Sequence, residues 1–214
     1  MIKPTSAHYN QRRKTSTLYF DDRDPMECSM RGGICWPITY ENAGRVDTNG
    51  YAVMCGYEIK TGNIYVFEQI QWITIDHIID PETRAIKYEG TAPWFNSLWN
   101  TYYAKSFYYH QSYDLSKRFV LAVGRSPMIG TRPRFVELPP TDAQDIISAL
   151  WMALKAGKLF REGDTELQRQ MEMVKSGDKQ VLPAVHAMGC ALVGIERFPW
   201  RKPYVENVQE VLVL

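Results

Sequence analysis

The chain contains Cys35, His186 and Asn207 in this order. A cysteine, a histidine and an asparagine can together form a nucleophilic catalytic centre. In such a centre the histidine accepts the thiol proton, the thiolate attacks the substrate, and the asparagine orients the imidazole ring. About 150 residues separate the cysteine from the histidine, so only the tertiary structure can bring them together. A simpler interpretation is that Cys35 is a buried thiol and His186 is a core or capping residue.

The local sequence around these residues resembles papain-type cysteine proteases, with Gly33-Ile34-Cys35-Trp36 near the start and His186-Ala187-Met188 far downstream. The resemblance implies a cysteine hydrolase in which the cysteine is the nucleophile, the histidine is the base and Asn207 orients the ring. Two features depart from that family. Pro37 prevents a long helix directly after the cysteine, and the histidine lies in a stretch with a helical pattern instead of a strand.

A second constellation combines aromatic and basic side chains in neighbouring segments. The stretch 91–113 is rich in large rings, and the stretch 117–134 carries five Lys or Arg residues and no Asp or Glu. Rings that stack on bases and cations that follow phosphates are what a binding surface for single-stranded nucleic acid needs. The candidate binding residues are Trp94, Trp99, Tyr102, Tyr109, Lys117, Arg118, Arg125, Arg132 and Arg134. The alternative is that the rings form the core and the cations form a solvated rim.

The elements that must position these residues follow from the periodicity of the sequence. Runs of β-branched and aromatic residues predict an antiparallel meander over about 51–88, with Lys60-Thr61-Gly62 as a hairpin turn. Apolar residues at helical spacing predict one aromatic helix over 92–112. Further strands are predicted at 118–123 and 134–138, and helices at 142–156, 164–175 and 184–198. Because most of the strands precede most of the helices, the sequence predicts an α+β fold.

The domain organisation follows from the same pattern. Residues 1–25 are polar and charged, which predicts an N-terminal arm outside the core. Residues 26–214 then form a single α+β domain, with a helical C-terminal subregion at 141–200. Near the start of this domain, Gly32-Gly33 permits a tight turn or a close backbone approach, and Pro37 predicts either an edge strand or the end of a strand instead of a central strand.

The predicted order of a meander, a helix, further strands and terminal helices resembles ribonuclease-H-like folds, including viral packaging nucleases. The stretch 185–192 resembles the terminal helix of those nucleases. The resemblance implies phosphoryl chemistry with two metal ions held by converging carboxylates. Glu58, Glu68 and Asp76 are the candidate carboxylates, whereas the terminal helix carries His186 and Gly189 where an acid is expected. Both an active nuclease and an inactive relative therefore stay open.

Composition limits the partners and the compartment. The net charge of +1 provides no broad field for nucleic acid or a membrane surface. The cysteines do not form a CxxC pair, so we expect no metal site, no cofactor and no disulfide framework. The chain lacks an apolar run of the roughly 20 residues that span a bilayer. We therefore expect no membrane partner and a location in the cytoplasm or within a viral particle.

These observations lead to one main prediction and two alternatives. The main prediction is a non-enzymatic structural or interaction subunit of a larger assembly, such as a viral particle or a DNA-packaging complex. Its partner is expected to be another protein or a second copy of the chain, contacted through the aromatic helix, with nucleic acid as a further partner through 117–134. The alternatives are a ribonuclease-H-like nuclease domain or its inactive relative, and a cysteine hydrolase that uses Cys35 and His186.

Overall fold

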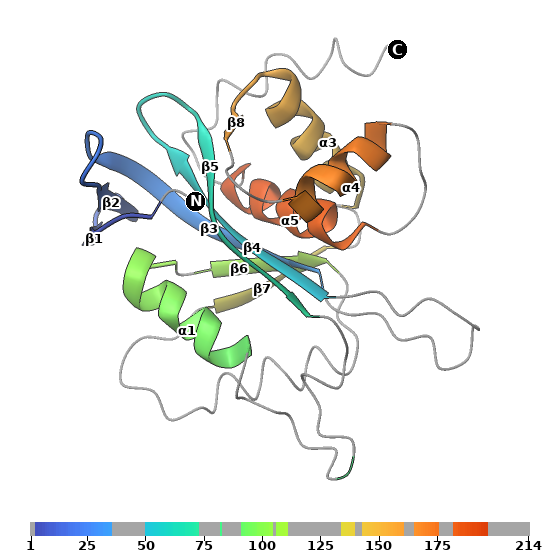
Figure 1. The fold of residues 1–214 in the computed structure, drawn as a ribbon, viewed down its shortest axis with the longest axis horizontal. Coiled ribbons are helices and arrows are strands. Elements are labelled where there is room, and N and C mark those ends of the chain that lie inside the picture. Colours follow the sequence, from blue (N-terminus) through green and yellow to red (C-terminus); the bar gives the residue numbers. More distant parts are fainter. Residues whose placement is uncertain are drawn as a thin grey trace.

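The computed structural model describes residues 3–35, 50–72, 82, 91–104, 106–110, 134–139, 143–160, 165–175 and 182–196. Within these ranges one mixed sheet of eight strands separates two groups of helices (Figure 1). Helices α3 (Ala143–Lys155), α4 (Thr165–Lys175) and α5 (Pro183–Glu196) contribute to the larger core on one face of the sheet. Helix α1 (Thr91–Tyr102) contributes to a smaller core on the other face. The predicted α+β class is confirmed.

The strand order places the meander in the middle of the sheet. The path runs β1-β2-β3-β4-β5-β8, antiparallel from β1 to β5 and parallel between β5 and β8, while β6 pairs in parallel with β3 and β7 in parallel with β6. The strands are β1 (Ser6–Asn10), β2 (Thr15–Tyr19), β3 (Met26–Cys35), β4 (Gly50–Glu58), β5 (Ile64–Trp72), β6 (Ser106–His110), β7 (Arg134–Leu138) and β8 (Leu159–Phe160).

Strand β3 is the centre of this sheet and ends at Cys35. Of the two alternatives predicted near Pro37, an edge strand is therefore wrong and a strand end agrees with β3, although Pro37 itself lies outside the described residues. One edge of β3 pairs with β4 from Cys28 to Cys35. Its other edge is shared, because β2 pairs with residues 26–28 and β6 pairs with residues 32–34. The Gly32-Gly33 pair is therefore part of a buried strand, and of its two predicted roles the close approach is the one observed.

The predicted polar arm at 1–25 is corrected by the structure, in which β1 and β2 form a hairpin of the sheet. The side chain of Leu18 is fully buried in the smaller core. The Ser16 hydroxyl donates a hydrogen bond of 2.9 Å to the carbonyl of Tyr102. The turn is held by Asn10, whose side-chain oxygen accepts the backbone N–H groups of Arg12 and Arg13. A few inward positions are thus enough to join a largely polar segment to the core.

The predicted aromatic helix over 92–112 is corrected to a helix followed by a strand. Helix α1 ends at Tyr102, and Tyr103 has a φ of 55°, a left-handed value that cannot continue the helix. The next rings alternate across strand β6: Phe107 belongs to the smaller core and Tyr108 to the larger core. Pairing with β3 and β7 thus recruits into the sheet a segment whose apolar pattern also fits a helix.

The other predicted elements within the described ranges are confirmed with small changes of boundary. The hairpin at the start of the predicted 51–88 meander is β4 and β5, the strand at 134–138 is β7, and the three predicted C-terminal helices are α3, α4 and α5. The meander also includes β3, which the sequence did not assign to it. The predicted strand at 118–123 and the later part of the meander lie outside the described residues. None of the described helices is long and apolar enough to cross a membrane.

The two glycines of β3 allow close contacts on both faces of the sheet. A Cβ atom at Gly33 would lie 1.8 Å from the backbone oxygen of Ala187 in α5, and one at Gly32 would lie 2.0 Å from the ring of Phe107. Helix α5 is likewise closely packed at Gly189 against Ile146 of α3. The absence of side chains at these points lets the backbone of α5 approach the central strand.

We predict that Gly33→Ala destabilises the protein, because the added methyl group meets helix backbone that cannot rotate away. Overpacking of this kind costs roughly 1–3 kcal/mol of unfolding free energy, or more where backbone must move. Urea denaturation of the variant and the parent protein measures the change. The control is Gly157→Asn, at a position with a φ of 60° and no atom within 4 Å of an added Cβ, where we expect little change. An unaltered midpoint for Gly33→Ala would contradict the packing of α5 on β3.

Candidate functional site

The carboxyl end of β3 is the place where the predicted catalytic residues come closest to forming a site. Because β3 and β6 are parallel, both strands end there, and the rings of His110 and His186 meet edge-on with centroids 5.8 Å apart. Cys35 ends β3, and Cys190 lies one turn after His186 on α5, where its thiol interacts with both Cys35 and the backbone of His110. This group of two cysteines and two histidines is called the β3 terminus cluster below.

Burial dominates the electrostatics of this cluster. Burial raises the pKa of the Cys35 thiol to about 12. Burial and the neighbouring Cys35 also raise the pKa of Cys190, against a smaller lowering by a backbone hydrogen bond from His110. For His186, burial and then the nearby His110 lower the pKa to about 4. Each shift favours the uncharged form, so the two thiols and His186 are neutral near pH 7.

These protonation states do not suit the predicted cysteine hydrolase. An activated nucleophile needs a thiol whose pKa is lowered by a histidine or another positive group. Here the thiol pKa is raised, and Cys35 lies at the end of a central strand with 3% of its surface exposed. The third predicted member, Asn207, lies outside the described residues. The buried-thiol interpretation of Cys35 accounts for these observations, and the hydrolase is not carried forward.

The candidate carboxylates of the ribonuclease-H-like alternative do not converge within the described part of the chain. Glu58 lies at the β4–β5 turn, where it accepts hydrogen bonds from Thr61 and Tyr65. Glu68 lies further along β5 and accepts a hydrogen bond of 2.9 Å from the hydroxyl of Tyr102. Asp76 is outside the described residues, and the described ones include no group of three His, Cys, Asp or Glu side chains that could hold a metal ion. They therefore do not fit a two-metal centre.

The predicted binding residues are divided between the core and the surface. Tyr102 and Tyr109 are buried, with 1% and 7% of their surface exposed, because α1 and β6 both pack into the smaller core. Their rings therefore cannot stack on a ligand at the surface. Arg134 is exposed at the start of β7. The side chains of Trp94, Trp99, Lys117, Arg118, Arg125 and Arg132 lie outside what the structure describes.

Sequence reasoning missed two members of the β3 terminus cluster. His110 was assigned to the aromatic helix, and Cys190 stood alone without a partner at metal-binding spacing. No local signal joins them to Cys35, because the register of β6 against β3 and the packing of α5 create the group. The sequence also missed Lys14 and Arg31, which line a pocket with Arg134.

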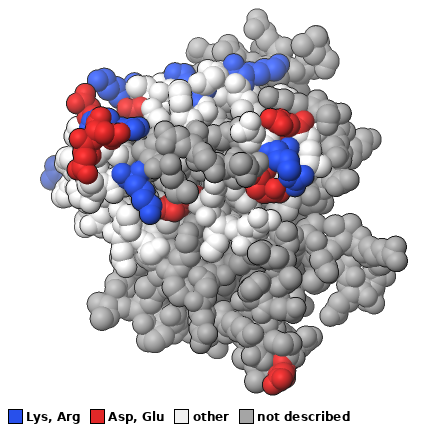
Figure 2. Space-filling model, in the orientation of Figure 1, with Lys and Arg blue, Asp and Glu red and all other residues white. Residues whose placement is uncertain are grey.

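The described surface has no broad region of one charge on the face in view. In Figure 2, Lys and Arg side chains are interspersed with Asp and Glu side chains. Among the described residues, Arg13 forms an ion pair with Glu27 at 3.2 Å and Arg169 with Glu166 at 2.7 Å.

Comparison with known proteins gave one finding on structure. No family model matches the sequence, and no curated protein is similar to it. Among solved structures, the chain is similar to the yeast mitochondrial Holliday junction resolvase Ydc2, with a TM-score of 0.44 and 10% sequence identity. The alignment covers 84% of this chain and 83% of the resolvase chain.

The main functional prediction, a non-enzymatic structural subunit of a larger assembly, is corrected. The similar solved structure carries the name of a resolvase and not of a structural subunit. That prediction depended on the aromatic helix as a contact surface, and two of its four named rings, Tyr102 and Tyr109, are core residues.

We predict that thiol-reactive reagents label Cys35 of the native protein slowly at pH 8, because the thiol is buried and its pKa is about 12. All four cysteines are buried and none forms a disulfide, so labelling should become fast only in denaturant. Mass spectrometry after timed quenching gives the rate at each site, and His186→Ala should not lower the native rate at Cys35. Fast labelling of Cys35 that is lost in His186→Ala would revive the hydrolase hypothesis.

We predict that His186 makes the protein less stable as the pH falls from about 6.5 to about 4. Its pKa is lowered in the folded state, so in this window the unfolded chain binds a proton that the folded chain does not, and stability rises with pH. One such group contributes a slope of at most about 1.4 kcal/mol per pH unit. Urea denaturation at several pH values should show a shallower slope for His186→Gln and an unchanged slope for the exposed control His8→Gln. Identical slopes for all three proteins would contradict the burial of His186.

Proposed function

We propose that this chain is a ribonuclease-H-like domain that binds nucleic acid. The observation that carries the proposal is the path of the chain through the sheet. The meander β3-β4-β5 is followed by α1, then by β6, which returns to pair in parallel with β3, and then by β7 and the terminal helices. This is the order of elements that the resemblance to ribonuclease-H-like folds implies.

The position of α5 adds support to the same proposal. The resemblance assigns 185–192 to the terminal helix of the fold, and this stretch lies in α5, whose backbone packs on β3 at Gly33. The residues where an acid is expected are His186 and Gly189, and Ile146 of α3 occupies the space beside the glycine. We therefore propose nucleic-acid binding by this domain, without a metal-dependent reaction at these two residues.

A binding experiment with several forms of DNA tests the proposal. We expect labelled single-stranded, duplex or four-way-junction DNA to bind the full chain in fluorescence anisotropy at about 50 mM salt, with affinity falling as salt rises. Each phosphate contact contributes about 0.7–0.9 to the slope of log affinity against log salt. The double variant Arg132→Ala/Arg134→Ala removes up to two contacts and should make the slope shallower by roughly 1–2.

The matched control is Lys60→Ala/Lys155→Ala, which removes the same charge from exposed positions at the β4–β5 turn and the end of α3. Its salt slope should equal that of the parent protein. The same reactions with Mg²⁺ distinguish the two forms of the proposal. Cleavage would make the chain an active nuclease whose acidic residues lie outside the described ranges, and binding without cleavage would make it an inactive relative. Absence of binding to every DNA form by the folded protein would refute the proposal.

A further inference from the structure

The shared edge of β3 creates a recess in the sheet. Strand β2 pairs with β3 up to Cys28, and β6 begins its pairing at Gly32. The intervening residues 29–31 have no register partner in either strand, and a pocket opens at this gap with a volume of about 360 Å³. Pockets of this size accommodate small organic ligands. The gap lies between two strands that pair with the same edge of β3, β2 in the antiparallel and β6 in the parallel direction.

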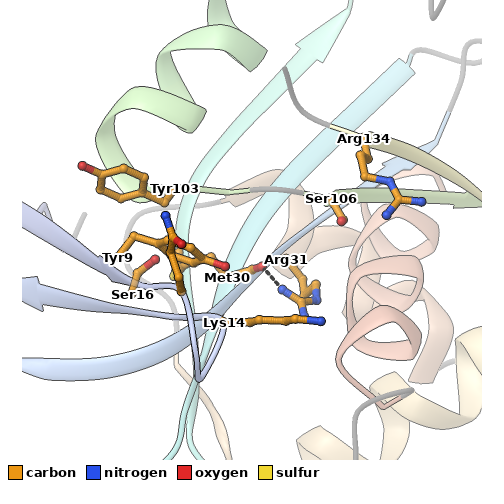
Figure 3. Close-up of a pocket in the computed structure, with 9 residues that line it drawn as sticks. Tyr9, Lys14, Ser16, Met30, Arg31, Tyr103, Ser106 and Arg134 are labelled. Carbon is orange, nitrogen blue, oxygen red and sulfur yellow. Dashed lines mark hydrogen bonds between the residues drawn. The ribbon is translucent and has the colours of Figure 1, made fainter. Parts of the chain in front are cut away.

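The charges that line the pocket have one sign. Lys14, Arg31 and Arg134 reach it from the β1–β2 turn, from β3 and from the start of β7 (Figure 3). The remaining lining residues are Tyr9, Gln11, Ser16, Met30, Tyr103 and Ser106, so the described lining contains no Asp or Glu. Three cations around one recess are more than a single carboxylate neutralises, whereas a phosphate monoester carries about two negative charges near neutral pH.

The cations extend from backbone positions that the fold fixes. Lys14 has a φ of 57°, and its backbone N–H donates a 2.8 Å hydrogen bond to the carbonyl of Asn10, which fixes the turn. Arg31 is 5% exposed and donates a 2.6 Å hydrogen bond to the carbonyl of Met30. Arg134 stands opposite Ser106 in the β6–β7 register, and both side chains line the pocket. Guanidinium groups match the oxygen geometry of phosphate well.

One wall of the pocket offers an aromatic surface. The rings of Tyr9 and Tyr103 stack with centroids 5.7 Å apart and an interplanar angle of 26°. This pair comes from β1 and from the residue that follows α1. Tyr9 of β1 stands opposite Ser16 of β2 in the strand register, and the Ser16 hydroxyl donates its hydrogen bond to Tyr102 at the end of α1. Tyrosine rings of this kind provide an apolar face for a planar base and a hydroxyl for hydrogen bonding.

We propose that this pocket binds the 5′-phosphate of a nucleotide, with Lys14, Arg31 and Arg134 around the phosphate and the Tyr9–Tyr103 pair beside the nucleoside. The same chemical group occurs in a free mononucleotide and at the 5′ end of a strand. The inference does not rest on the proposed function, because a free nucleotide would occupy the pocket whether or not the chain binds longer nucleic acid.

Titration calorimetry with adenosine 5′-monophosphate and with adenosine tests the proposal on the full chain. We expect the monophosphate to bind at least about 10-fold more tightly, because charge-assisted hydrogen bonds to phosphate are lost in the nucleoside. The variants Lys14→Asn and Arg134→Gln alter exposed positions and should each weaken binding about 10-fold. Asparagine tolerates the left-handed backbone at position 14, so this variant should fold normally. Arg31 is left unchanged because it is buried.

The controls are Lys60→Gln and Lys155→Gln, which remove positive charge from exposed positions outside the pocket and should bind like the parent protein. Equal affinity for monophosphate and nucleoside, absence of binding, or equal weakening by the controls would overturn the proposal. A 5′-phosphorylated oligonucleotide and its 5′-hydroxyl counterpart identify the source of the phosphate. A preference for the phosphorylated strand over the mononucleotide supports a strand end, and tighter binding of the mononucleotide supports a free nucleotide.

Discussion

The packing of two layers directly against strand β3 is the constraint on which the rest of this structure depends. At Gly33 the backbone of α5 comes so close that a single methyl group would overlap the carbonyl of Ala187. At Gly32, on the opposite face, the ring of Phe107 occupies the equivalent space. Such contacts exclude water from both faces of the strand and fix the distance of α5 from it. The larger and smaller cores therefore meet at these two adjacent residues.

Strand β3 is also paired along both of its own edges. Its pairing with β4 is continuous, but its other edge serves first β2 and then β6. The division has two consequences. It sends the chain after α1 back to the centre of the sheet, which is the feature that supports a ribonuclease-H-like domain. It also leaves residues 29–31 beside an open recess. The division of one edge of β3 between β2 and β6 therefore accounts for both the return of β6 and the pocket.

The polar groups at the two places along this strand have opposite electrostatic character. At the carboxyl end, Cys35 and Cys190 belong to the larger core and His186 lies beside them, and burial keeps the thiols and His186 neutral. At the recess, Lys14 and Arg134 remain exposed, and the buried Arg31 accompanies them. Burial is the largest cause of each pKa shift in the cluster. The loss of water disfavours the charged form of each group, and the smaller causes do not reverse that effect. The cationic recess is therefore better suited to an anionic ligand than the neutral β3 terminus cluster is.

Local sequence determined the elements whose pattern is independent of distant partners. The β4–β5 hairpin follows from its alternation and from the turn at Gly62, whose φ is 71°. Helices α3, α4 and α5 follow from their apolar periodicity and from Pro183 at the start of α5. These choices are governed by side-chain spacing and backbone sterics over a few residues, so the α+β class could be predicted without the structure.

Only the tertiary structure decided which strand is central, where the aromatic segment changes from helix to strand, and which charged groups share a pocket. The segment 92–112 has an apolar pattern that fits a helix, and pairing with β3 and β7 settles its second half as β6. Lys14, Arg31 and Arg134 are far apart in the sequence, and no local rule relates them. Their proximity depends on strand register, which the sum of many long-range contacts determines and no short window of sequence encodes.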